Sequence, residues 1–308
     1  TLLLTLVLIL VTTGLLVLFS ASEYNGRVRF HDSAYYFKKQ LFATALGLGV
    51  MYIVSSINYN FFIRLAPAAY LLSMVLSTAV LLVGQEINGS RRWLSFGPLS
   101  FQPSEFAKVA VILFLTWQIE RTQKKTGSFW FLCRTMLSLL PIVGLVGSNN
   151  LSTAIIILGI GVILVFVSSP GYIQFIGPAC AGVGFIAVFL AAESYRLERL
   201  AIWRNPEKFE KGFQTIQGLY AIGSGGLFGR GFGNGLQKLG FVPEAQNDMI
   251  FSIICEEFGL VGSISLIIVF GLLLWRLCVI SMHARTLTGA LVAAGIMGHL
   301  AIQVILNI

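Results

Sequence analysis

Residues 135–192 decide the fold, and they read TMLSLLPIVGLVGSNNLSTAIIILGIGVILVFVSSPGYIQFIGPACAGVGFIAVFLAA. This stretch contains no Asp, Glu, Lys or Arg. It is far longer than the roughly 20 residues with which an α-helix crosses a bilayer, at about 1.5 Å per residue. It must therefore fold back on itself. The natural breaks are at 147–150 and 168–171, where Gly, Pro, Asn and Ser favour turns. Three membrane spans are expected here.

Apolar runs elsewhere in the chain predict six further spans, at 1–22, 40–63, 65–85, about 104–118, about 258–275 and 286–308. Hydrophobic residues make up 56% and charged residues 11% of the 308 positions, which excludes an ordinary soluble domain. We therefore expect an all-α, polytopic membrane helix bundle with nine visible spans. Residues 2–19 lack the charged n-region and cleavage site of a signal peptide, so a first span is favoured over a cleaved leader.

The cysteines give no sign of a disulfide framework or a metal site. Cys133, Cys180, Cys255 and Cys278 are scattered singly through or beside apolar segments. This pattern predicts small buried hydrophobic side chains.

Two polar insertions interrupt the apolar runs, at 85–104 and 193–247. The second holds seven of the 21 Lys and Arg residues, alternating with aromatic residues. Such a mixture is typical of short helices at the level of the lipid headgroups. Within it, the glycine-rich stretch 225–235 contains G-x-G-x-x-G spacing, but no strand precedes it. It therefore predicts backbone that approaches another group closely, and not a nucleotide site.

Four stretches taken together resemble one family. They are NGSRRWL at 88–94 followed by QPSEFAK at 102–108, QTIQ at 214–217, the glycine-rich stretch, and QKLGFVPEAQNDMIF at 237–251 with Glu256 and Glu257. These are similar to the SEDS proteins, the shape, elongation, division and sporulation family that includes FtsW, RodA and SpoVE. The resemblance covers nearly the whole chain. It is closer to the FtsW and SpoVE branch than to RodA.

The resemblance implies one SEDS-type domain over 1–308, with an extracytoplasmic loop at 193–247 between spans seven and eight. It implies an enzyme that polymerises lipid II, the undecaprenyl-pyrophosphate-linked disaccharide peptide, at the outer face of the bacterial cytoplasmic membrane. The expected partners are a class B penicillin-binding protein, which cross-links the strands, and the divisome or a related cell-wall complex, with no nucleic acid. The family has a tenth helix that is absent here, so we expect the chain to be incomplete.

The chain departs from the family pattern at two polar positions. An acidic residue often follows the fifth span, whereas this chain has Asn150. A histidine is common two residues before the key aspartate, whereas this chain has Gln246. Neither an acid at the first position nor a histidine proton shuttle at the second can be assumed.

Asp248 is the candidate catalytic base. It follows a polar loop and precedes the apolar run 249–251, which puts its carboxylate at the mouth of a span. Glycosyl transfer with a pyrophosphate leaving group needs a base for the acceptor hydroxyl and a cationic clamp for the leaving group. The alternative is that Asp248 only stabilises the N-terminus of the following helix.

Arg230 and Lys238 are the candidate clamp, and the resemblance adds Gln237 beside them. Glu256 is the nearby carboxylate expected on the same helical face as Asp248, because seven or eight residues return to one side of a helix. With Glu257 it could hold a divalent cation, the only cofactor considered.

Glu105 and Lys108 form a second candidate site. They are three residues apart on one helix face, after an early Pro103. Ionisable groups at membrane depth cost on the order of 3 kcal/mol each, so they suggest a function. The pair either lines the substrate cavity or only locks two spans together. Arg91, Arg92 and Trp93 lie in the preceding loop, where Trp93 could stack on a sugar or anchor the interface.

The charge distribution conflicts with the orientation that the resemblance implies. The loops 23–39, 85–104 and 193–247, all outside in that orientation, carry 4, 2 and 7 of the 21 Lys and Arg residues. The positive-inside rule would place them in the cytoplasm. We follow the resemblance and interpret these residues as ligands for an anionic lipid pyrophosphate. A lipid II flippase and a scaffold that recruits a transpeptidase remain the alternative functions, although the chain lacks the internal repeat typical of transporters.

Overall fold

The computed structural model describes residues 2–87, 90–96, 99–122, 129–169, 171, 202, 204–209 and 212–308. Its backbone contacts divide the chain into two compact units. The first unit contains residues 1–55, 179–273 and 307–308, and the second contains residues 56–178 and 274–306. Six of the described helices are long and apolar enough to cross a membrane.

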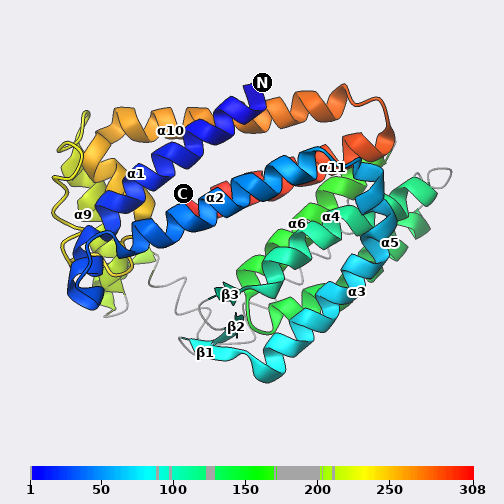
Figure 1. The fold of residues 1–308 in the computed structure, drawn as a ribbon, viewed down its shortest axis with the longest axis horizontal. Helices are drawn as coiled ribbons and strands as arrows, with labels where there is room; N and C mark the ends of the chain where they lie inside the picture. The colour runs from blue at the N-terminus through cyan, green and yellow to red at the C-terminus, as the bar shows by residue number, and fades with distance from the viewer. Residues whose placement is uncertain are drawn as a thin grey trace. The chain divides into compact units, whose positions relative to one another are not determined.

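The first unit is built from long helices and one irregular segment. Its described helices are α1 (Leu2–Phe30), α2 (Tyr35–Ser55), the short η3 (Pro206–Lys208), α9 (Phe213–Gly225) and the greater part of α10 (Ile250–Met282). α1 packs on α2, and Figure 1 shows the irregular segment between α9 and α10 at one end of this unit. The candidate catalytic residue Asp248 lies in this segment.

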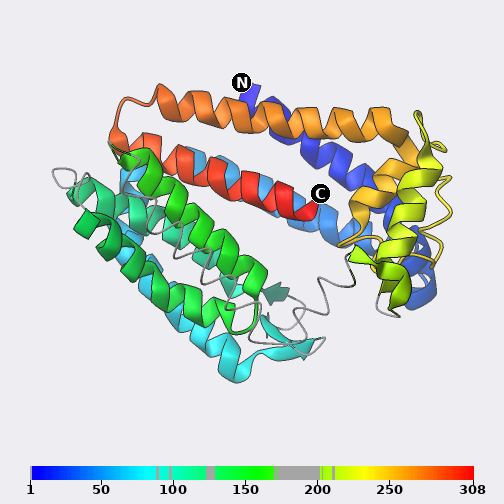
Figure 2. The ribbon, with the colours of Figure 1, turned by 180° about the vertical axis from the view of Figure 1, so that it is seen from behind.

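The second unit is a helix bundle with a small sheet at one end. It contains α3 (Tyr59–Val83), α4 (Pro103–Arg121), α5 (Phe129–Gly147), α6 (Leu151–Ser168), most of α11 (Leu287–Asn307) and the end of α10. Between α3 and α4 the chain forms the antiparallel strands β1 (Gln85–Ile87), β2 (Ser90–Phe96) and β3 (Leu99–Phe101). Figures 1 and 2 both show the strands at the end of the bundle where α3 ends and α4 begins.

The core of the second unit lies where α4, α5 and α6 meet. Leu115, Ile142 and Ile160 are fully buried there. α11 comes close to this core because Gly295 and Gly298 face side chains of α4 and α6 with little space for a Cβ. Apolar side chains also cover the outside of the unit, as a helix surrounded by acyl chains requires.

The predicted all-α membrane bundle is confirmed, and the break at 147–150 is found between α5 and α6. Several expected boundaries are wrong. The expected span 40–63 ends at Ser55, and α3 begins at Tyr59 after Asn58, whose side chain accepts from Asn60 N. The search for charge-free runs did not detect this break, because Asn58, which caps the start of α3, is uncharged. It also started the next span after Arg64, although α3 includes this exposed arginine.

Other predictions concern α10, the sheet and residues beyond the described part. α10 begins eight residues before the expected position 258. The sheet in the polar insertion 85–104 was not predicted. Cys133, Cys255 and Cys278 are free thiols. The expected span from 172 to 192, including Cys180, lies outside the described residues.

Candidate functional site

The glycine-rich stretch meets α10 at a break in that helix. Gly259 has φ 66° and ψ −165°, which no helical residue adopts, so α10 kinks there. The kink leaves backbone groups without partners inside the helix, and the glycine-rich stretch supplies those partners. Four hydrogen bonds of 2.9–3.1 Å join the two segments: Arg230 N to Glu256 O, Gly231 N to Glu257 O, Leu260 N to Gly226 O and Val261 N to Leu227 O.

Glycine is required at this junction because the two backbones touch. A Cβ on Gly229 would lie 2.2 Å from Glu257 O, and a Cβ on Gly259 would lie 2.3 Å from Gly229 N. Gly229 also has a φ of 78°, which favours glycine. The close backbone approach predicted from the glycine-rich sequence is therefore confirmed.

Glu256, which precedes the kink in α10, binds the residues that follow the glycine-rich stretch. Its side chain is fully buried. Its Oε1 accepts from Leu236 N at 2.8 Å, and its Oε2 accepts from Gln237 N at 3.2 Å. The Nε of Arg230 lies 4.0 Å from Glu256 Oε1. Backbone donors therefore satisfy this buried carboxylate, and the exposed Arg230 adds positive charge beside it.

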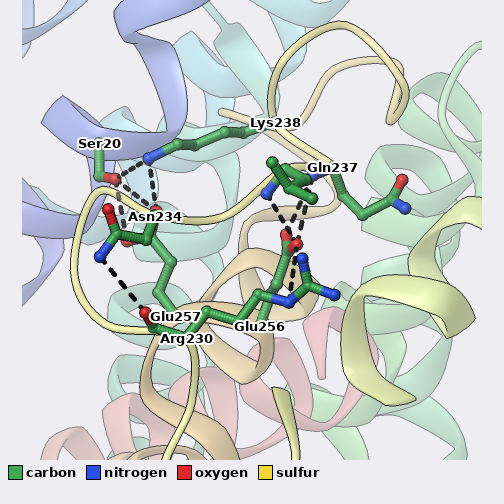
Figure 3. Close-up of polar contacts among 8 residues, drawn as sticks. Ser20, Arg230, Asn234, Gln237, Lys238, Glu256 and Glu257 are labelled. Carbon is green, nitrogen blue, oxygen red and sulfur yellow. Dashed lines mark hydrogen bonds and ion pairs between the residues drawn. The ribbon is translucent and has the colours of Figure 1, made fainter. Parts of the chain in front are cut away.

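Glu257 forms the second buried contact, shown beside Glu256 in Figure 3. Lys238 Nζ lies 2.5 Å from Glu257 Oε1, and the two side chains are only 3% and 0% exposed. Ser20 of α1 donates to Glu257 Oε1 at 2.6 Å and accepts from Lys238 Nζ at 2.6 Å. We call Ser20, Lys238 and Glu257 the buried triad. It joins α1 to two segments that follow it by more than 200 residues.

Contacts with α1 extend towards Asp248. Asn25 Nδ2 donates to Gln246 Oε1 at 2.7 Å. Val242 and Ala245 pack on Ala21 of α1 and on α10. Asp248 itself is exposed, and its carboxylate has no hydrogen bond or ion pair with any residue that the structure describes. A carboxylate held on an anchored segment and left free for a ligand has the properties of a general base.

The structure thus brings some of the predicted site residues together in one cluster, in which some of them are buried and others are exposed. Gln237, Lys238, Arg230 and Glu256 all belong to one cluster around the start of α10, as Figure 3 shows. Glu256 and Lys238 are buried inside it, whereas Arg230 and Asp248 have exposed surface. The predicted contact of Arg230 with pyrophosphate stays a prediction, and so does that of Lys238, whose ammonium is already paired.

The predicted pair on α4 is present. Lys108 Nζ lies 2.8 Å from Glu105 Oε2, with Lys108 1% exposed and Glu105 51% exposed. Lys108 also donates to Gln303 Oε1 of α11 at 3.2 Å. Lys108 therefore links α4 to α11, while about half of the Glu105 side chain is exposed. This geometry is compatible with both predicted roles, the helix lock and the cavity wall.

The arginines of the first polar insertion lie on β2. Arg92 Nε donates to Asn149 O at 3.1 Å, and Asn149 Nδ2 donates to Arg91 O at 3.0 Å. These bonds attach β2 to the turn between α5 and α6. Trp93 is half-buried on the same strand. Its stacking and anchoring roles both remain predictions.

The two glutamates do not fit the divalent-cation site considered from the sequence. Their oxygens face backbone N–H groups, an ammonium and a hydroxyl, which are donors to a carboxylate and not further cation ligands. Across the described part of the chain, no group of three or more His, Cys, Asp and Glu side chains could hold a metal ion. A role for a divalent cation stays untested.

Sequence reasoning missed the contribution of α1. Ser20 and Asn25 are ordinary polar residues near the end of an apolar helix, and nothing in their local sequence connects them with residues more than 200 positions away. The sequence suggests for Glu257 only a shared divalent-cation site with Glu256, and not a pairing with Lys238. The available signal was its charge: a buried glutamate inside an apolar helix needs a cationic partner.

Comparison with known proteins places these features in a family. A family model described as "Cell cycle protein", for FtsW, RodA and SpoVE, matches residues 1–308. Stage V sporulation protein E of Bacillus subtilis is 35% identical, over 100% of this chain and 86% of its own length. A probable peptidoglycan glycosyltransferase FtsW of Saccharophagus degradans is 34% identical, over 98% of this chain and 80% of its own length.

Solved structures agree with this result. A chain from the structure "Structural coordination of polymerization and crosslinking by a peptidoglycan synthase complex" matches with a TM-score of 0.81 and 30% identity, covering 99% of this chain and 84% of its own. The rod shape determining protein RodA of Thermus thermophilus matches with a TM-score of 0.69 and 28% identity, covering 99% and 82%. The chain therefore belongs to the FtsW, RodA and SpoVE family of polytopic membrane proteins, and within it to the FtsW and SpoVE type.

Proposed function

We propose that this chain is a peptidoglycan glycosyltransferase that polymerises lipid II into glycan strands. The observation that carries the proposal is the environment of Asp248. Its exposed carboxylate lies two residues before α10, on a segment that buried contacts attach to α10 and α1. Relatives that match nearly the whole chain are named probable peptidoglycan glycosyltransferases, which supports the same activity.

In the proposed reaction, Asp248 accepts the proton of the acceptor sugar hydroxyl. The hydroxyl oxygen attacks the anomeric carbon of the donor sugar, and the bond from that carbon to the pyrophosphate oxygen breaks. Undecaprenyl pyrophosphate leaves with the electron pair, and the anomeric configuration inverts. Arg230 is an exposed cation on the same segment and stabilises the charge that develops on the leaving group.

The proposal includes the location and the partner. The active face is the outer face of the bacterial cytoplasmic membrane, because lipid II polymers are used outside the cell. A class B penicillin-binding protein cross-links the strands, in line with a structural relative whose description couples polymerisation and crosslinking in a peptidoglycan synthase complex. The process served is cell division or sporulation, because one relative is named a stage V sporulation protein and the family model is described as a cell cycle protein.

The test is polymerisation of labelled lipid II by the purified chain with its transpeptidase partner. Asp248→Asn should abolish glycan synthesis while lipid II binding and thermal stability stay near those of the unsubstituted protein, because a base acts on the transition state. Glycan synthesis within a few-fold of the unsubstituted rate would refute the role of Asp248. Translocation of lipid II without polymerisation would support the flippase alternative.

A further inference from the structure

A small pocket in the second unit, with apolar and polar lining residues, lies where the sheet meets the helix ends. It has a volume of about 20 Å³, which is room for one water molecule or one phosphoryl oxygen. Its polar wall comes from α3, β2, the start of α4 and the turn between α5 and α6. The polar residues that line it are Ser77, Arg91, Arg92, Ser104, Asn149 and Asn150.

The charge of this pocket is positive. None of its lining residues, all in the described part of the chain, is acidic. Arg92 uses its Nε to bind Asn149 O, which fixes the side chain at the pocket. Its two terminal nitrogens have no hydrogen-bond or ion-pair partner among the described residues. A guanidinium held in this way offers the planar pair of donors that fits phosphate oxygens.

The hydroxyl of Ser77 provides an independent sign of a ligand. Ser77 is only 3% exposed, and its Oγ has no hydrogen-bond partner within the described residues. A buried hydroxyl without a partner is unfavourable, and such a group calls for an explanation. An acceptor oxygen that enters the pocket would supply the missing partner.

The start of α4 adds a further donor. Gln102 occupies the N-cap position of α4 without making a side-chain cap hydrogen bond. Pro103 has no N–H and Glu105 N already donates to Gln102 O, so the donor that the first turn adds is the N–H of Ser104, at the positive end of the helix dipole. At the neighbouring helix start, Asn150 caps α6 with a neutral amide, which does not repel an anion.

We propose that this pocket binds a phosphoryl oxygen of a lipid-linked pyrophosphate. The inference rests on the proposed function: polymerisation joins two lipid-linked saccharides, and each of them carries a pyrophosphate. The pocket with Arg92 and Ser77 serves one of these anions.

The experiment measures lipid II binding to the full chain in nanodiscs of zwitterionic lipid. Arg92→Gln should raise the Kd about 10-fold at low salt, the loss expected for one charge-assisted hydrogen bond, and less at high salt. Ser77→Ala should raise it a few-fold. The controls are Arg64→Gln, an exposed arginine on α3, and Ser73→Ala, a buried serine on the same helix that already bonds to Tyr70 O. Both controls should leave the Kd unchanged.

Competing ligands identify the source of the phosphoryl group. Inorganic pyrophosphate should displace lipid II, and Arg92→Gln should weaken this displacement. Arg92→Lys keeps the charge and should recover part of the affinity, which separates binding from a folding defect. Unchanged affinity in both pocket variants would overturn the proposal. Equal displacement by phosphatidylglycerol would also overturn it, because the pocket would then bind ordinary headgroups.

Asp248→Asn separates this inference from the proposed function. If Asp248→Asn still polymerises lipid II while Arg92→Gln binds it weakly, the catalytic role of Asp248 fails and the pocket stands. If Asp248→Asn is inactive and both pocket variants bind normally, only the pocket fails.

Discussion

Replacing Lys238 by Met tests whether the buried triad holds the segment that carries Asp248. The substitution removes the ammonium and fills nearly the same volume. Glu257 would keep one hydroxyl donor, Ser20, and lose its only cationic partner in the described structure. The carboxylate is 0% exposed, so water cannot compensate for the loss without opening the segment.

The expected loss is about 3–5 kcal/mol, the range for removing one partner of a buried ion pair. At 1.36 kcal/mol per factor of ten, the ratio of folded to unfolded protein decreases by a factor of between about 100 and several thousand. Replacing both Lys238 and Glu257 by Met should recover most of this stability, because apolar side chains of similar volume often substitute for a buried pair without loss.

The assays are thermal unfolding in detergent and lipid II polymerisation. The control is Lys38→Met, which breaks an exposed pair with Asp32 in the same unit. Lys38 lowers the pKa of the Asp32 carboxyl by a hydrogen bond, so these groups do interact. Water screens the pair, and the control should change stability little. An unfolding temperature of Lys238→Met equal to that of the control would refute the reasoning. The double variant should fold and still polymerise slowly, because the segment loses its fixed position.

Three further predictions follow from the geometry. Gly229→Ala should destabilise the protein by more than about 1 kcal/mol in denaturant unfolding, which is about the cost of a strained positive φ, because its Cβ would meet Glu257 O. The neutral control is Gly14→Ala, whose Cβ would have no other atom within 4 Å. Replacing both Glu105 and Lys108 by apolar residues should restore folding but not polymerisation if the pair lines the cavity, and an active, stable double variant would assign it to helix locking. Arg230→Gln should weaken lipid II binding at low salt. An unchanged Kd at low salt would show that Arg230 does not bind the pyrophosphate.

The long-range pattern of the sequence predicts the helices well. Apolar runs and the turn residues at 147–150 predict α5, α6 and the break between them, although α5 begins at Phe129, before the charge-free run, because the bilayer selects for length and polarity over about 20 residues. The predicted helix boundaries were wrong where the residue that caps the helix is uncharged. Asn58 caps the start of α3 through one side-chain hydrogen bond, which no hydropathy count detects.

The candidate site was predictable in composition and less so in arrangement. Ionisable residues within or at the mouth of apolar segments identified Lys108, Glu256 and Asp248. The pairing of Lys238 with Glu257 depends on the kink at Gly259 and on Ser20 of α1. Ser20 lies more than 200 positions from Lys238 and Glu257, and a single sequence does not show that residues so far apart are in contact.

The kink in α10 also has a consequence for how the protein is made. A helix with open backbone groups cannot settle in hydrocarbon until other groups bind them. The glycine-rich stretch that binds them comes before α10 in the chain, so it leaves the ribosome first. When α10 is synthesised, the backbone that completes it is already present, and the broken helix never has to wait in the membrane for a later segment.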